Sequence, residues 1–165
     1  MAVEDFGTWR RELLAIDLVP HDDDSVPQEE ADRRWARFVE LADLVDGSEG
    51  TDVASTLVAA LRAEEDYGAH QAVYSALERL EPQALTLGVV AAAVDLVTIP
   101  WENSGAVLQL ATLVATPDDL TAFGTALDRL DPRLRSELIA LITQHEQGEW
   151  LADERSIGRL RAQPR

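Results

Sequence analysis

Apolar residues recur at spacings of three and four along nearly the whole chain, and the strict alternation of a half-buried strand is almost absent. This spacing places apolar side chains on one face of a helix. Phe6, Trp9 and Leu13 form one such face, and Trp35 and Phe38 begin another. The sequence therefore predicts an all-α fold.

Proline marks the beginning of several expected helices. Glu81-Pro82, Thr116-Pro117 and Asp131-Pro132 each place a capping or helix-start residue before a proline in the first turn, where the missing N–H costs nothing. The expected helices after residue 82 cover 83–98, 103–115, 118–130, 132–147 and a short stretch at 153–162. The first two are apolar nearly all round, which predicts central positions. Their short loops require antiparallel neighbours.

A chain of 165 residues fits one domain. We expect a single all-helical domain over 1–165, with an N-terminal helical pair and acidic loop at 1–50, hairpins at 51–152, and a C-terminal helix and tail at 153–165. Pro82 and Pro117 are 35 residues apart, close to the length of one helical-hairpin repeat. This spacing favours a short HEAT-like α-solenoid. A compact orthogonal helical bundle is the alternative, because the units share little residue-level similarity.

The chain carries a net charge of -17, from 31 acidic residues against 14 basic residues that are all arginine, and it has no cysteine. The lack of cysteine excludes disulfides, thiolate nucleophiles and cysteine-ligated zinc. Residues 1–81 hold 20 acidic residues and 7 arginines, a charge of -13, whereas residues 82–165 carry -4. Direct nucleic-acid binding is therefore not expected, since phosphate contacts need clustered basic residues. Arg33-Arg34 lies beside acidic residues, so we expect local ion pairs.

We expect a cytoplasmic protein without membrane contact. The longest apolar stretch, 85–99, is interrupted by Gly88, Asp95 and Thr98. The first six residues include Glu4 and Asp5 and lack the basic and apolar pattern of a signal peptide.

Catalytic patterns are weak, and we expect neither enzyme activity nor a cofactor. The pair His21-Asp22 is similar to that of metal-dependent all-helical phosphohydrolases, but those enzymes have a further histidine upstream, and none precedes position 21. His70 and His145 fall near helix ends, where surface or capping positions explain them. The serines show no nucleophile elbow or triad spacing.

Two acidic runs, Asp22-Asp23-Asp24 and Glu64-Glu65-Asp66, are candidate contact sites. Both lack the spaced ligands and turn glycine of a calcium loop. A solvated acidic segment, contact with a partner and metal binding stay open for each run. The acidic first half favours electrostatic steering of a basic protein partner, and solubility alone is the plainer explanation of the charge.

A stretch from Glu65 to Tyr74, the short hairpins after it and Gly148-Glu149-Trp150-Leu151 are similar in layout to HEAT-like immunity proteins of bacterial polymorphic toxin systems, including those of the contact-dependent inhibition type. The resemblance covers about residues 51–152. It implies a protein that binds and blocks one cognate toxin domain, often a nuclease, in the cell that makes it. Residues 1–50 lie outside the resemblance.

The resulting hypothesis is a non-enzymatic immunity protein that blocks a basic toxin domain through an acidic surface. A HEAT-like adaptor or scaffold for another basic protein, and a structural domain whose charge serves solubility, are the alternatives. Neither a metal nor a cofactor is expected. The aromatic candidates are proposed as interface anchors, with core packing as the other explanation. The predicted partner-binding residues are Asp22, Asp23, Asp24, Asp46, Glu49, Asp52, Glu64, Glu65, Asp66, Tyr67, Tyr74 and Trp101.

Overall fold

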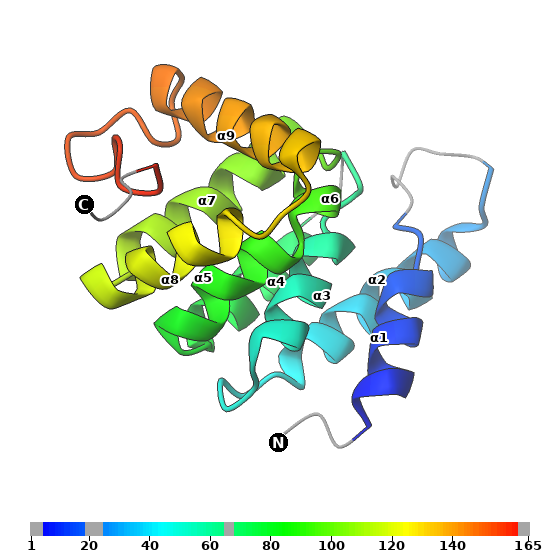
Figure 1. The fold of residues 1–165 in the computed structure, drawn as a ribbon. Coiled ribbons are helices and arrows are strands. Elements are labelled where there is room, and N and C mark those ends of the chain that lie inside the picture. The colour runs from blue at the N-terminus through cyan, green and yellow to red at the C-terminus, as the bar shows by residue number, and fades with distance from the viewer. Residues whose placement is uncertain (1–4, 19–24, 65–67, 162–165) are drawn as a thin grey trace.

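A computed structural model describes residues 5–18, 25–64 and 68–161. Within these ranges the chain forms nine helices and no strand, which confirms the all-α prediction (Figure 1). None of the described helices combines the length and the apolar character needed to cross a bilayer. The helices are α1 (Phe6–Ala15), α2 (Gln28–Asp43), α3 (Thr51–Ala60), α4 (Ala69–Arg79), α5 (Pro82–Ala91), α6 (Ala93–Leu96), α7 (Trp101–Val114), α8 (Pro117–Leu127) and α9 (Pro132–Gln147).

The three proline-marked helix starts are confirmed, because α5, α8 and α9 each begin at the expected proline. At α8 the capping is reciprocal: the N–H of Asp119 donates to Thr116 Oγ1 at 3.3 Å, and the N–H of Thr116 donates to Asp119 Oδ2 at 2.9 Å. At α9 the Asp131 carboxylate accepts the backbone N–H of Arg133 at 3.0 Å. These contacts satisfy donors that have no partner within the helix.

The helices contact one another in a regular order. Helix α1 contacts α3, α3 contacts α5, and α5 contacts α8, while α2 contacts α4 and α4 contacts α7. Figure 1 shows the helices crossing the molecule in approximate chain order, from α1 and α2 on the right to α9 at the upper left. Successive long helices run in alternating directions. The α2–α3, α4–α5 and α7–α8 connections therefore lie along one edge, and the α3–α4, α6–α7 and α8–α9 connections lie along the opposite edge.

Helix α5 is central, as predicted, because it contacts α3, α7 and α8. A Cβ added at Gly88 would lie 2.3 Å from Ala54 Cβ, so glycine permits the close approach of α5 to α3. The single helix predicted over 83–98 is wrong. The chain leaves helical geometry at Ala92 (φ -88°, ψ 13°), and α6 then turns to contact α3 and α9 with Leu96 fully buried.

The segment after α9 runs along α7. The short helix predicted at 153–162 is wrong over its described part, since residues 153–161 form turns. Gly158 has a φ of +77°, a left-handed conformation that interrupts a helix. Buried Leu151 and Leu160 anchor the segment to the core, and a Cβ on Gly105 would lie 2.2 Å from Trp150 Cδ1, so the Trp150 ring packs directly on the α7 backbone.

At the C-terminal ends of four helices, backbone carbonyls accept hydrogen bonds from side chains that lie later in the chain. The last carbonyls of a helix lack the N–H partner four residues later that earlier carbonyls have, so other donors can stabilise them. The donors lie 34 to 48 residues after their acceptors. They are Arg62 to Leu14 and Ile16 at the end of α1, Arg79 to Ala42 and Val45 at the end of α2, Asn103 to Leu61 and Ala63 at the end of α3, and Arg159 to Thr112 and Ala115 at the end of α7.

Candidate functional site

The structure divides the predicted binding residues into two groups. Asp46, Glu49 and Asp52 lie at the α2–α3 connection, whereas Glu64 follows α3 at the opposite edge. The 10 residues of α3 separate these positions by about 15 Å, at 1.5 Å per residue. The predicted acidic residues therefore do not form one patch. Six of the predicted residues lie outside the described part of the chain: Asp22, Asp23, Asp24, Glu65, Asp66 and Tyr67.

The α2–α3 and α4–α5 connections lie against each other. Gly47 has a φ of +103°, and a Cβ placed there would lie 2.3 Å from the carbonyl oxygen of Arg79, the last residue of α4. This close approach brings Glu78 and Glu81 to the same edge, and sequence reasoning missed both residues. Their signal in the sequence was their position beside the turn before Pro82. We define the acidic edge as Asp46, Glu49, Asp52, Glu78 and Glu81.

Two carboxylates of the acidic edge are held by the loop itself. Glu49 accepts the backbone N–H groups of Asp46 and Gly47 at 3.2 and 2.9 Å. Asp46 Oδ1 accepts the hydroxyl and the N–H of Ser48 at 2.7 and 3.1 Å. These hydrogen bonds from Ser48 lower the pKa of Asp46 from 3.8 to about 2. Both side chains are thus fixed acceptors with their charge in place at neutral pH.

The other three carboxylates face solvent. Asp52, Glu78 and Glu81 are exposed, and their carboxylates make no hydrogen bond or ion pair within the described part of the chain. Arg79 lies among them, but its Nε donates to the carbonyl of Val45 at 2.9 Å, and its nearest contact with Asp43 is 3.9 Å. The guanidinium thus closes α2, and its one positive charge is outnumbered by the five carboxylates of the acidic edge.

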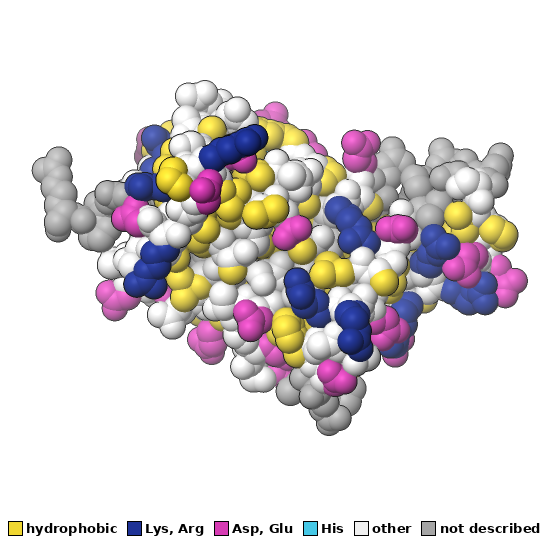
Figure 2. All heavy atoms as spheres, turned by 45° about the vertical axis from the view of Figure 1, so that its right-hand side comes forward, with side chains coloured by type: hydrophobic (Ala, Val, Ile, Leu, Met, Phe, Trp, Pro, Cys, Tyr) yellow, Lys and Arg dark blue, Asp and Glu magenta, His cyan; other side chains and the backbone are white. Residues whose placement is uncertain are grey.

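Acidic and basic side chains are mixed on the face of the molecule that Figure 2 shows. Figure 2 shows arginine side chains beside acidic ones over much of one face. The expected ion pairs of Arg33 and Arg34 are confirmed, since both contact Glu30, at 2.6 and 2.9 Å. Arg37 bridges α2 to α1 through Glu12 at 2.7 Å. The carboxylates of Asp52, Glu78 and Glu81 differ in having no ion pair within the described chain.

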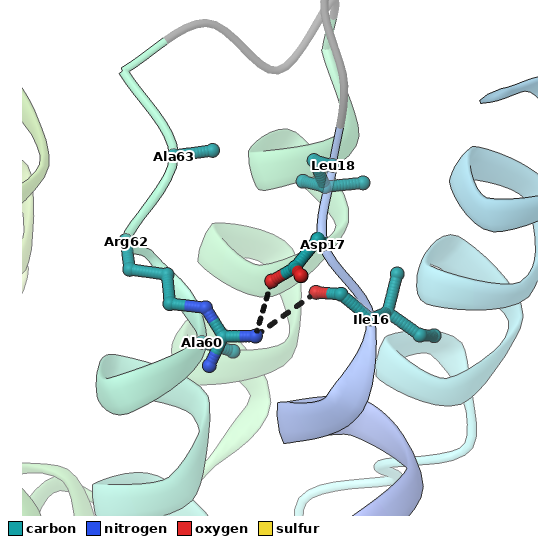
Figure 3. Close-up of a pocket in the computed structure, with 6 residues that line it drawn as sticks. All are labelled: Ile16, Asp17, Leu18, Ala60, Arg62 and Ala63. Carbon is teal, nitrogen blue, oxygen red and sulfur yellow. Dashed lines mark hydrogen bonds and ion pairs between the residues drawn. The ribbon is translucent and has the colours of Figure 1, made fainter. Parts of the chain in front are cut away.

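A hollow of about 290 Å³ lies near the opposite edge (Figure 3). Its lining includes Arg62, which reaches from the end of α3 toward the segment that follows α1. One guanidinium nitrogen donates to the carbonyl of Ile16 at 3.1 Å and to Asp17 Oδ1 at 3.2 Å. The arginine is therefore used to join α3 to the end of α1.

The two described aromatic candidates, Tyr74 and Trp101, both contact other side chains of the folded protein. The hydroxyl of Tyr74 donates to Asn103 Oδ1 at 2.9 Å, and the Asn103 amide donates to the carbonyls that end α3. Tyr74 thus belongs to a structural hydrogen-bond chain. Trp101 is 42% exposed, and its ring stacks on His145 with 3.6 Å between centroids. Both residues lie toward the edge opposite the acidic one.

The surface or capping positions predicted for His70 and His145 are wrong. His70 is buried beside the Phe38 ring, where α4 packs on α2. His145 is fully buried, and its Nε2 lies 3.0 Å from Ser104 Oγ. Burial lowers the pKa of His145 from 6.5 to about 4, so its ring is neutral at pH 7. Serine next to histidine is a pairing used by hydrolases, but both residues are shielded from solvent and therefore from substrate.

Comparisons of the chain with models of protein families, with curated proteins and with solved structures found no match. Among the described residues, no three histidine, aspartate or glutamate side chains gather in a group that could hold a metal ion. The candidate functional site is the acidic edge, because five carboxylates gather there around two adjoining connections, and three of them face solvent without a basic partner in the described chain.

Proposed function

We propose that this protein is a non-enzymatic immunity protein of a bacterial toxin system, which acts in the cytoplasm and blocks a basic toxin domain. The observation that carries the proposal is the acidic edge, where Asp52, Glu78 and Glu81 face solvent without a basic partner in the described chain. A basic protein surface supplies the missing positive charges. The layout shared with HEAT-like immunity proteins supports the choice of a toxin as that partner.

The proposal includes a short HEAT-like stack of helical hairpins. The contact order α1, α3, α5, α8 beside α2, α4, α7 supports it, because the pairs α1–α2 and α3–α4 each pack on the helices that follow along both of their own helices. The repeated closing of helix ends by a later side chain supports it further, with Arg62, Asn103 and Arg159 in equivalent roles. In such a stack, successive connections present their side chains along one continuous edge.

Negative charge concentrated at this edge raises the rate at which a basic partner finds it. The attraction between exposed charges extends over about one Debye length, roughly 10 Å at 0.1 M salt. The acidic edge is therefore expected to accelerate association by tenfold or more at low salt and to lose this effect at high salt. Asp46 and Glu49 contribute fixed charges, since the loop already orders them.

The test uses the product of the gene next to this one, expressed in cells with and without the protein. Immunity predicts that the neighbouring product is toxic alone and harmless when the protein is present. Association of the two purified proteins is then measured by stopped flow at 0.05 and 0.5 M salt. The test variant carries Asp52→Arg, Glu78→Arg and Glu81→Arg. The control carries Glu64→Arg, Asp95→Arg and Glu102→Arg, which reverse three exposed charges of the opposite edge and give the same net charge.

We expect the test variant to associate about tenfold more slowly at low salt and to protect cells poorly, while the control stays near wild type. Equal effects of the two variants would show that net charge matters and the acidic edge does not. Binding without protection from toxicity would exclude immunity and favour an adaptor. A neighbouring product that is neither toxic nor bound would refute the proposed function.

A further inference from the structure

A hollow of about 410 Å³ opens at the acidic edge, between the beginning of α1 and the beginning of α3. Phe6 and Val53 give it apolar walls from the two helices. Val53 is buried, and the Phe6 ring packs on Trp9 with 5.9 Å between centroids, so the walls belong to the folded core. Among the residues that the structure describes, its lining is Phe6, Glu49, Gly50, Thr51, Asp52 and Val53.

Two carboxylates accompany these apolar walls. Glu49 is oriented by the N–H groups of Asp46 and Gly47, whereas the Asp52 carboxylate has no hydrogen bond or ion pair within the described chain. The N-terminus of α3 contributes about half a positive charge at the same place. Two full negative charges exceed it, so the hollow has a net charge of about -1.5 by this count. Its potential therefore favours a cation over an anion.

We propose that this hollow receives an arginine side chain of the basic partner, an inference that rests on the proposed function. Arginine combines an apolar stem with a flat cation that stacks on aromatic rings and donates to carboxylates in pairs. The hollow offers both requirements: apolar contact from Phe6 and Val53, and acceptors from Glu49 and Asp52. Buried arginine anchors of this kind carry a large share of the affinity in many interfaces.

The experiment titrates the 15N-labelled full chain with the peptide acetyl-Gly-Arg-Gly-amide and follows the backbone amides by NMR. The comparison peptide carries citrulline, which has nearly the shape of arginine and no charge. We expect the arginine peptide to shift the amides of Gly50, Thr51 and Val53 in a saturable way. The citrulline peptide should bind about tenfold more weakly, since a charge-assisted hydrogen bond is lost.

A matched pair of variants locates the binding. Asp52→Asn removes one carboxylate of the hollow, and Asp118→Asn removes the carboxylate at the same second position of α8, which is also exposed and makes no hydrogen bond or ion pair in the described chain. The arginine peptide should bind about tenfold more weakly to Asp52→Asn and unchanged to Asp118→Asn. The peptide contrast on the wild-type chain needs no variant, so the test holds even if one variant folds poorly.

Three results would overturn the inference: no saturable shift at Gly50, Thr51 and Val53, equal binding of the two peptides, or equal losses in the two variants. Any of these results could occur while charge reversal at the acidic edge still slows association with the partner. The proposed function would then stand, and the arginine-binding role of the hollow would not. In the opposite case, the arginine peptide binds the hollow saturably but charge reversal does not change association with the partner. That outcome would refute the proposed function, and the hollow would remain a binding site for a cationic side chain.

Discussion

Lowering the pH from 7 to 5 is expected to destabilise the folded protein through His145. The pKa of this buried ring is about 4, against an ordinary value of 6.5 in the unfolded chain. Between these values the unfolded chain binds a proton that the folded protein does not, so the free energy of unfolding falls as the pH falls. At pH 5 the unfolded value is about 1.5 pH units away, which corresponds to about 2 kcal/mol at 1.36 kcal/mol per unit.

The assay is urea unfolding followed by circular dichroism at pH 7, 6 and 5 and constant ionic strength, for the wild type and for His145→Gln. Carboxylates titrate in both proteins, so the difference between them isolates the histidine. His145→Gln starts less stable, because the stack on Trp101 is lost. From pH 7 to pH 5 the wild type should lose about 2 kcal/mol more than the variant.

Parallel loss of stability in the wild type and the variant would refute the reasoning, because it would mean that His145 takes up its proton equally well in the folded protein. His145→Phe provides an independent check, since it keeps an aromatic ring near Trp101 and cannot titrate. This variant should show the same shallow pH dependence as His145→Gln. A pH dependence as steep as that of the wild type would assign the effect to other groups.

Two further predictions concern packing and are checked by urea unfolding at pH 7. Asn103→Leu should lower the free energy of unfolding by about 3 kcal/mol or more, because two carbonyls at the end of α3 and the Tyr74 hydroxyl lose their hydrogen-bond partner. Tyr74→Phe should lower it by only about 1 kcal/mol, since it removes one hydrogen bond. Equal losses in the two variants would contradict the central role of the Asn103 amide. Gly105→Ala should destabilise by about 1 to 3 kcal/mol, since the new Cβ meets Trp150 Cδ1 at 2.2 Å. Gly124→Ala, with nothing within 4 Å of the new Cβ, should stabilise by up to about 1 kcal/mol, and a loss there would contradict the packing described.

Sequence reasoning succeeded where the signal is local. The cap before each proline is decided within one helical turn, so the beginnings of α5, α8 and α9 were predictable. It failed where contacts between helices distant in sequence determine the local structure. The break at Ala92 serves the packing of α6 on α3 and α9, and the burial of His145 depends on a ring from α7. Asn103, a polar side chain in an apolar helix, is a signal of such a contact that can be seen in the sequence.

The candidate site was predictable only in part. Asp46, Glu49 and Asp52 lie close together because a short loop holds them, which the sequence indicates directly. Glu78 joins them through the contact of Gly47 with the end of α4, which depends on tertiary structure. Glu64 belongs to the other edge because a helix carries the chain away from its starting point. Residues near in sequence therefore separate, and residues distant in sequence meet.

The late side chains that close helix ends also set an order for folding during synthesis. The carbonyls at the end of α1 lack their side-chain donor until Arg62 is synthesised, 48 residues after Leu14. A ribosome adding about 5 to 20 residues per second leaves that helix end open for about 2 to 10 seconds. The end of α7 likewise lacks its donor until Arg159 is made, 47 residues after Thr112.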